Sequence, residues 1–152
     1  EPSAIARIGT YLGAPVEWAT LDEAADYLQG ISKGFGPHSR DEWLALTRPM
    51  LIARGDKLVP HYDPAIGVPF RAITPEIAAA GEAALWRSYD AIACPTLLLR
   101  GADSDLLTRA TAQAMTERGP RARLHEFAGV GPAPTLVARA QIEVVREFLL
   151  SP

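Results

Sequence analysis

The residues with the clearest potential for chemistry lie in the last third of the chain. Two carboxylates, Asp103 and Asp105, follow an apolar run that ends in Arg100-Gly101. A carboxylate at the end of a strand can orient an imidazole base and stabilise its charged form. The same Asp103-Ser104-Asp105 sequence also suits the cap of a following helix, because Asp and Ser accept hydrogen bonds from free backbone N–H groups. The local sequence leaves both interpretations open.

The elements that would position these carboxylates alternate between strand and helix. We expect strands over residues 95–100 and 124–127, and helices over residues 106–115 and 135–150. The first strand is a continuous apolar run, which is typical of a buried strand in a parallel sheet covered by helices. A single strand pair leaves sheet edges without partners. We therefore expect another part of the protein or a partner chain to complete the sheet.

The first part of the chain is predicted to be helical. Apolar spacing indicates a helix over residues 4–12, with Gly13 as its stop. Thr20-Leu21-Asp22-Glu23 and Ser39-Arg40-Asp41-Glu42 are capping-box sequences that start two further helices. Pro49 lacks a backbone N–H, so it should kink or split the second of these.

A proline-rich connection follows these helices. Arg54-Gly55-Asp56-Lys57 reads as a turn, and residues 58–69 read as irregular. Thr74-Pro75 then places a capping residue before a first-turn proline, which predicts the start of another helix.

Residues 92–107 resemble the strand and loop that present the triad acid in α/β-hydrolases. The family pattern I-x-x-P-T-L-x-L-R-G-x-x-S-D-L-L is matched from Ile92 to Leu107. Gly129-Val130-Gly131, with Ala133-Pro134 after it, matches a second family segment that reads Gly-His-Ala-Pro at its end. Weaker likeness at residues 62–66 and 86–90 extends the resemblance over nearly the whole chain.

The resemblance implies a fold class and a domain plan. The fold would be α/β, as a partial α/β-hydrolase fold. Residues 1–91 would form a helical lid, and residues 92–152 the strand-helix-strand-helix part of the core. The resemblance also implies that Asp105 is the triad acid, with Asp103 as the alternative.

The other two triad members are expected to be absent from this chain. In the family, the nucleophile precedes the acid and the histidine, and it stands on a Gly-x-Ser-x-Gly elbow. We expect no such elbow here and place it ahead of residue 1, in a segment before the Glu1 start. The position of the histidine is occupied by Pro132, which has no side-chain base. Restoring a nucleophile would therefore not be enough for activity.

Three histidines could in principle replace the missing base. His125 lies within the second predicted strand, and His38 reads as a solvated loop residue between a Gly-Pro turn and a capping box. His61, beside Tyr62-Asp63-Pro64, is the best substitute, although a poor one. No histidine pair has metal-ligand spacing and no Cys-x-x-Cys occurs, so we expect no metal site.

The lid of an α/β-hydrolase sets substrate preference and excludes water. The resemblance therefore implies that apolar residues of this segment face the substrate. The candidates for this role are Phe35, Met50, Leu51 and Phe70.

Composition excludes several other classes of protein. The net charge of −3 gives no basic footprint for nucleic acid. No apolar run approaches the length of a membrane span, and the first residues do not form a signal peptide. Cys94 is the only cysteine, so no intrachain disulfide can form, which favours a reducing, cytoplasmic location.

The expected function is ester-type hydrolysis of a small-molecule substrate without a cofactor, as implied by the family. This chain alone should be inactive, because it lacks both the nucleophile and the base. The main alternative is a non-catalytic relative that binds ligands or acts as a scaffold, which Pro132 supports. A helical module that pairs with a partner chain through its strand edge ranks third.

Overall fold

A computed structural model describes residues 12–151 of the chain. The contacts divide it into two compact units. The strand unit consists of Gly34–Gly36 and the residues from Thr74 onward, and the helix–hairpin unit consists of the described residues up to Lys33 and Pro37–Ile73. The division therefore falls at residues 73 and 74, whereas the lid boundary at residue 91 remains a prediction.

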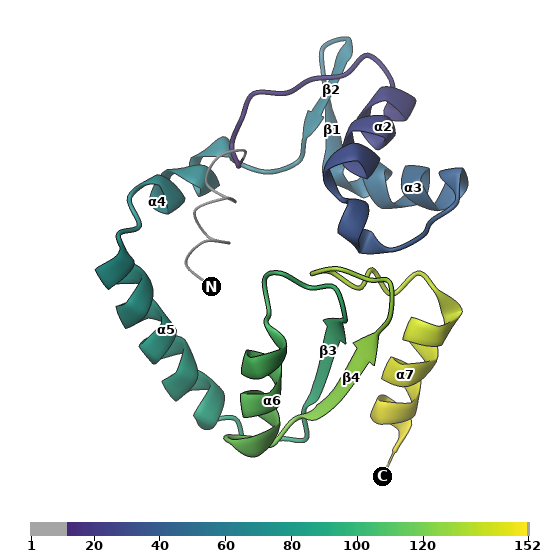
Figure 1. The fold of residues 1–152 in the computed structure, drawn as a ribbon. Helices are drawn as coiled ribbons and strands as arrows, with labels where there is room; N and C mark the ends of the chain where they lie inside the picture. Colours follow the sequence, from purple (N-terminus) through teal and green to yellow (C-terminus); the bar gives the residue numbers. More distant parts are fainter. Residues whose placement is uncertain (1–11, 152) are drawn as a thin grey trace. The chain divides into compact units, whose positions relative to one another are not determined.

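The strand unit is built on two parallel strands (Figure 1). β3 (Leu97–Gly101) pairs with β4 (Arg123–Phe127), and Leu99 lies opposite His125. α6 (Arg109–Glu117) connects the strands and α7 (Arg139–Leu150) follows them, so that the two helices flank the pair in Figure 1. The predicted strand-helix-strand-helix order and the parallel pairing are confirmed.

Both helices begin later than the sequence predicted. α6 starts at Arg109 rather than at residue 106, because Thr108 is its N-cap and accepts a hydrogen bond from the Thr111 N–H at 3.1 Å. α7 starts at Arg139 rather than at residue 135. Leu136 has a φ of 57°, a left-handed conformation that a right-handed helix cannot contain.

The strands are less buried than an apolar run predicts. Leu97, Leu98 and Leu99 are half-buried, and only Arg100 and Gly101 of β3 are buried. Among the described residues, β3 and β4 form a sheet of two strands, so each has one neighbour. Several large apolar side chains of the same unit are exposed: Ile77, Leu85, Ile142, Leu149 and Leu150.

The end of α5 (Pro75–Asp90) is joined to the end of α6. Thr74 caps the start of α5, as predicted. At its other end, the Tyr89 hydroxyl donates to the Met115 carbonyl at 2.6 Å, and the Arg118 guanidinium pairs with the Asp90 carboxylate. The hydrogen bond from Arg118 lowers the pKa of Asp90, and the same bond raises the pKa of Arg118. The guanidinium also lies 4.3 Å from the ring centroid of Trp86.

The helix–hairpin unit contains the two predicted helices with capping boxes. α2 (Leu21–Ile31) is capped by Thr20, and α3 (Arg40–Thr47) by Ser39. Hydrogen bonds from the backbone N–H and hydroxyl of Ser39 lower the pKa of Glu42. Pro49 lies in the 3₁₀ turn η2 (Arg48–Met50) that ends α3, as its missing N–H predicted.

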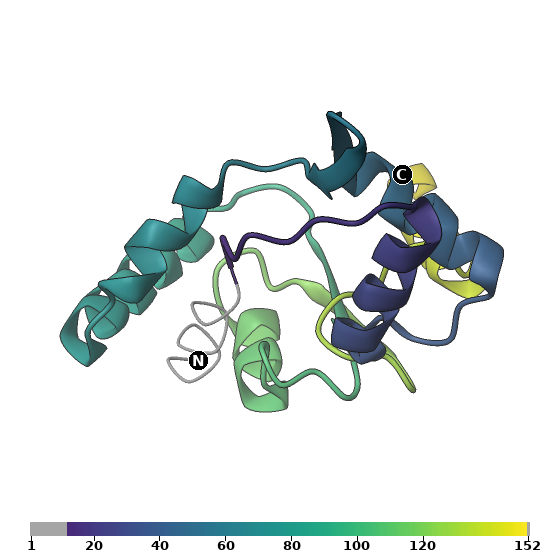
Figure 2. The same ribbon diagram turned by 90° about the horizontal axis from the view of Figure 1, so that it is seen from above.

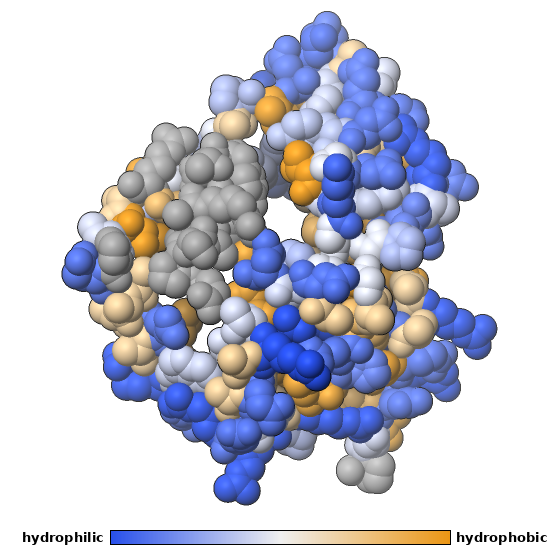
Figure 3. All heavy atoms as spheres, in the orientation of Figure 1, coloured by the Kyte–Doolittle hydropathy of each residue, from blue (hydrophilic) through white to orange (hydrophobic). Residues whose placement is uncertain are grey.

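α2 and α3 pack against each other, and Figure 2 shows them side by side. Arg40 of α3 donates to the carboxylates of Asp22 and Asp26 of α2, both at 2.6 Å, and its hydrogen bond to Asp22 is the main cause of its raised pKa. On the face drawn in Figure 3, hydrophilic residues predominate over these helices. Their small core is apolar apart from Thr47: Ala24, Ala25, Trp43 and Thr47 are buried.

A β-hairpin occupies part of the segment predicted to be irregular. β1 (Leu51–Arg54) pairs antiparallel with β2 (Lys57–Pro60), and Gly55 makes the turn at a φ of 64°. The turn prediction was correct, but the irregular prediction was wrong at the β2 residues. Pro60 closes β2, where a missing N–H costs no interior ladder bond.

Short helices make up the rest of the segment that was predicted to be irregular, so that prediction was wrong here as well. η3 (Pro64–Gly67) and α4 (Val68–Arg71) follow the hairpin, and η1 (Lys33–Phe35) lies between α2 and α3. Residues 4–11 of the first predicted helix lie outside the described residues. No helix within residues 12–151 is long and apolar enough to cross a membrane.

Candidate functional site

The loop after β3 carries both predicted acid residues. Asp103 and Asp105 are exposed in the segment between the end of β3 and Thr108. Because Thr108 is the cap of α6, the Asp103-Ser104-Asp105 segment is not the N-cap of that helix. The alternative explanation for these carboxylates, that they cap the helix, is therefore wrong.

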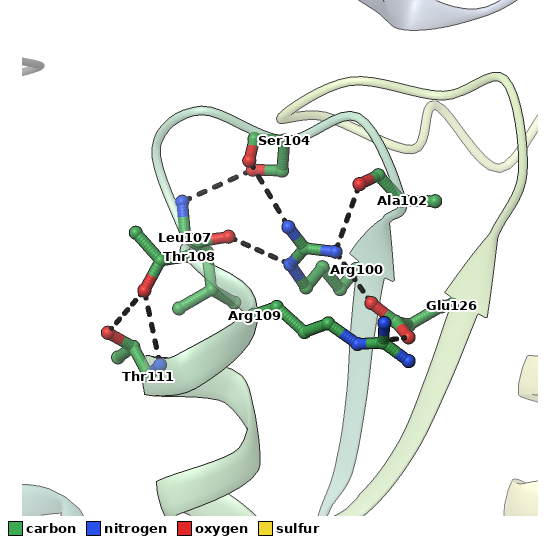
Figure 4. A network of polar contacts seen from close by, with 8 residues as sticks. All are labelled: Arg100, Ala102, Ser104, Leu107, Thr108, Arg109, Thr111 and Glu126. Carbon is green, nitrogen blue, oxygen red and sulfur yellow. Dashed lines mark hydrogen bonds and ion pairs between the residues drawn. The ribbon is translucent and has the colours of Figure 1, made fainter.

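A buried guanidinium lies inside this loop (Figure 4). Arg100, the fourth residue of β3, is 5% exposed. Its Nε donates to the Leu107 carbonyl at 2.8 Å, and its two Nη atoms donate to the carbonyls of Ala102 and Ser104, both at 3.2 Å. Nη1 also donates to Glu126 Oε1 at 2.6 Å. The loop is thus bonded at three points to one side chain.

The sequence pattern predicts no role for Arg100, which stands there only at the end of the apolar run and within the segment that resembles the family. A charged residue at the end of an apolar strand, directly before a loop rich in polar groups, was the available signal. The strand pairing decides its partner, because Arg100 lies opposite Glu126 in the register of β3 and β4.

Backbone hydrogen bonds join the loop after β3 to the loop after β4. The Ala102 N–H donates to the Phe127 carbonyl at 2.8 Å, and the Asp103 N–H donates to the Val130 carbonyl at 2.9 Å. The ladder between the two strands thereby continues beyond their ends. It brings the predicted acid loop next to Gly131, the residue before Pro132.

Three glycines allow the backbones to approach closely at this point. A Cβ on Gly101 would lie 1.9 Å from the Gly131 carbonyl oxygen, and a Cβ on Gly131 would lie 2.8 Å from the Cα of Gly34. The Gly131 N–H donates to the Gly34 carbonyl at 2.6 Å. We call Gly34, Gly101 and Gly131 the glycine contact. At Gly101 and Gly131, no larger residue fits without a shift of the backbone.

Pro132 lies exposed at the edge of the glycine contact. A Cβ on Gly34 would meet Pro132 Cδ at 3.0 Å. Residue 132 directly follows Gly131, whose carbonyl oxygen lies against Gly101 at the start of the loop that carries Asp103 and Asp105. Its side chain supplies no base.

The three histidines lie at other places. His125 is half-buried in β4, with its ring centroid 4.7 Å from that of Phe127. His61 is exposed, and its N–H donates to the Met50 carbonyl at 2.7 Å. The prediction of a solvated His38 is wrong for its side chain, which is only 3% exposed, packs edge-on against Trp43 and lies 3.9 Å from Glu42.

The predicted substrate-facing residues fall into both units. Phe35 is half-buried between Gly34 and Gly36, in the strand unit with the two loops. Met50, Leu51 and Phe70 belong to the helix–hairpin unit, where Met50 is exposed and the other two are half-buried. Of these four, Phe35 alone shares a unit with both predicted triad positions.

A Gly-x-Ser-x-Gly pattern does occur, as Gly30-Ile31-Ser32-Lys33-Gly34. Gly30 and Ile31 are the last residues of α2, and Ser32 is its C-cap, donating its N–H to the Leu28 carbonyl at 2.9 Å. A nucleophile elbow instead requires a strand directly before the serine and a helix directly after it. The position of this pattern at a helix end is not that of an elbow, and we assign Ser32 no catalytic role.

The described part of the chain offers no obvious metal site. Among residues 12–151, no group of three or more His, Cys, Asp or Glu side chains is arranged to hold a metal ion. The polar groups of the two loops are carboxylates, hydroxyls and backbone groups.

Comparison with solved structures gives the same fold. A putative hydrolase from Rickettsia typhi matches 98% of this chain and 49% of its own, with a TM-score of 0.80 and 26% identity. An α/β hydrolase from Novosphingobium aromaticivorans matches 97% of this chain and 52% of its own, with a TM-score of 0.80 and 29% identity. The chain belongs to the α/β-hydrolase superfamily. The predicted fold class, a partial α/β-hydrolase fold, is confirmed.

A sequence relative supports the same assignment. A 3-hydroxybutyrate-oligomer hydrolase from Cupriavidus necator is 48% identical over 151 residues, which cover 97% of this chain and 52% of that protein. No family model matches the chain. This chain spans about half the length of the relatives that it matches.

Proposed function

We propose that this chain supplies the acid loop and the histidine-position loop of an ester hydrolase, with the nucleophile in a part of the protein outside this chain. Asp105 is the triad acid in this proposal, and Asp103 is the alternative. The observation that carries it is the continued ladder, because the bond from the Asp103 N–H to the Val130 carbonyl joins the two loops. Acid and base positions on neighbouring loops are what a triad requires.

In such a triad, each group has a defined task. The nucleophile hydroxyl attacks the ester carbonyl carbon while the histidine takes its proton. The histidine then gives that proton to the leaving alcohol, and water repeats the cycle to release the acid. The carboxylate of Asp105 would hold the imidazole in the correct tautomer and stabilise its charged form.

Pro132 makes this chain inactive in the proposal. Without an imidazole at residue 132, no group in the loop accepts the proton of the nucleophile. A missing general base costs roughly a hundred- to ten-thousandfold in rate. The chain would therefore have no activity alone, and a complete protein with Pro132 would remain slow.

The proposed substrates are short esters of hydroxy acids. The relative that is 48% identical is named for hydrolysis of 3-hydroxybutyrate oligomers, whose units are joined by ester bonds. Residues 1–91 would act as the lid. Phe35, Met50, Leu51 and Phe70 are the side chains that we propose to contact the methylene and methyl groups of such a substrate.

The test uses the full-length protein that contains this chain. Pro132→His should gain hydrolysis of p-nitrophenyl esters and of 3-hydroxybutyrate oligomers by roughly a hundredfold or more over the parent. Pro134→His, which places an imidazole two residues later in the same loop, is the matched control and should gain nothing. Adding Asp105→Asn to Pro132→His should abolish the gain, whereas Asp103→Asn should not.

Two results would contradict this assignment. If Pro132→His stays inert in a protein with a nucleophile elbow, residue 132 is not the histidine position. If Asp103→Asn removes the gain and Asp105→Asn does not, the acid is Asp103.

A non-catalytic binding protein is the second candidate, and Pro132 is the observation that favours it. Such a protein would keep the fold of the site without the base. In calorimetry, the parent protein would bind 3-hydroxybutyrate oligomers and release no monomer over hours. Turnover by the parent at a rate comparable to Pro132→His would exclude this candidate.

A further inference from the structure

Arg100 is a buried charge that the triad chemistry does not use. Its side chain is 5% exposed, and the removal of a guanidinium from water is unfavourable unless its donors are bonded. It stands on β3, one residue before the loop that carries Asp103 and Asp105. The acceptors of its hydrogen bonds therefore show which part of the structure the guanidinium fixes.

Three of these partners are backbone carbonyls of that loop. They belong to Ala102, Ser104 and Leu107, at 3.2, 3.2 and 2.8 Å from the guanidinium nitrogens (Figure 4). Two of the carbonyls precede Asp105 in the chain and one follows it. The backbone that carries the Asp105 side chain is thus bonded to the same rigid group on both sides.

Glu126 orients the guanidinium from the neighbouring strand. Its Oε1 accepts from Arg100 Nη1 at 2.6 Å, and its Oε2 lies 3.7 Å from Nε of the exposed Arg109. The planar guanidinium presents its donors in a fixed fork, whereas a lysine ammonium presents three donors from one atom. Lysine at residue 100 could keep the charge but could not reach all four acceptors.

We propose that Arg100 is the positioning residue for the triad acid: it fixes the loop that presents Asp105 to residue 132. The inference rests on the proposed function, because it needs Asp105 to be the acid. Arg100 touches no reacting atom, so it acts on the rate only through Asp105.

The first test is amide hydrogen exchange in the full-length protein, which needs no activity. In Arg100→Lys, the amides of residues 102–107 should exchange about tenfold faster or more, while those of β4 stay within about twofold of the parent. Arg118→Lys is the matched control, because Arg118 follows the C-terminal end of α6, far from the loop in the chain. It should leave the exchange rates of the loop amides unchanged. Unchanged loop exchange in Arg100→Lys, or equal acceleration throughout the strand unit, would overturn the proposal.

The second test is a double-mutant cycle in the Pro132→His background. Arg100→Lys should lower kcat about tenfold or more and leave KM within about twofold. It should also move the acid limb of the pH–rate profile to lower pH, because a displaced carboxylate no longer favours the charged imidazole. In the presence of Asp105→Asn, Arg100→Lys should have almost no further effect on kcat.

The outcomes of the cycle separate the inference from the proposed function. An equal loss of kcat with and without Asp105→Asn would mean that Arg100 does not act through the acid, and the inference would fail. An inert Pro132→His protein would contradict the proposed function instead. The exchange experiment would still decide whether Arg100 fixes the loop.

Discussion

The loops that leave β3 and β4 lie side by side but are held by different means. The first is bonded to a buried guanidinium through three carbonyls. The second is held by backbone, through Gly131 against Gly34 and Gly101. The conformation of the loop after β3 depends on one side chain, that of Arg100. The glycine contact instead depends on the absence of side chains at its three positions. Residue 132 is exposed beside that contact, so the proposed exchange of its side chain should leave the scaffold intact.

Gly101→Ala should have the largest effect, because it breaks the contact between the loops. The new Cβ would lie 1.9 Å from the Gly131 carbonyl oxygen, and both partners are backbone. We expect a loss of about 3 kcal/mol in the free energy of unfolding, measured by urea denaturation.

Gly81→Ala is the control for this substitution. Nothing lies within 4 Å of its new Cβ in α5, and alanine favours a helix. It should stabilise the protein by about 0.5–1 kcal/mol. A Gly101→Ala protein as stable as the parent would show that the loops are not in close backbone contact.

Arg100→Met should have the second largest effect, because it removes the hydrogen bonds that hold the loop after β3 and leaves the glycine contact unchanged. It leaves three carbonyls and the partly buried Glu126 carboxylate without the donor that now bonds them. We expect a loss of about 2–3 kcal/mol in urea denaturation. The double variant Arg100→Met/Glu126→Met should recover part of this loss. If Arg100→Met costs less than about 0.5 kcal/mol, the loop does not depend on the guanidinium.

Gln141→Ala tests the segment that follows Pro132. The Gln141 side chain is buried, and its Oε1 accepts the Leu136 N–H at 2.8 Å, at the residue with a left-handed φ. We expect a loss of about 1–2 kcal/mol, because that N–H loses its acceptor. Gln113→Ala, on the exposed side of α6, should stay within about 0.5 kcal/mol of the parent by the same measurement. Equal effects of the two would mean that Gln141 does not hold the loop.

The smallest effect is expected from an ion pair outside both loops. The pKa of Asp90 is lowered from 3.8 by its hydrogen bond from Arg118. A lowered carboxyl pKa adds stability above the unfolded value, and this contribution is lost as the pH falls through the folded value. Asp90→Asn should therefore lower the Tm slightly at pH 7 and flatten its decrease below about pH 4. Arg118→Gln should give the same flattening, and an unchanged slope in both would exclude the pair as a source of acid sensitivity.

Local patterns predicted some elements well and others poorly. The capping boxes at Thr20 and Ser39 and the proline at residue 49 were correct, because caps and missing N–H groups act within one helical turn. The hairpin of β1 and β2 was not predicted. Its strands are four residues each, and they pair by backbone bonds that leave little trace in apolar spacing.

The sequence by itself determined the order of strands and helices in the second half, the place of the carboxylates after a strand and the absence of an imidazole at residue 132. These features follow from periodicity, from turn residues and from side-chain identity. The tertiary structure alone decided that Asp103-Ser104-Asp105 does not cap α6, that Arg100 pairs with Glu126, and that Gly101 lies against Gly131. The cap is a local choice, because the Thr108 hydroxyl accepts the Thr111 N–H. The other two features depend on the register of β3 with β4, which brings residues about 30 positions apart into contact.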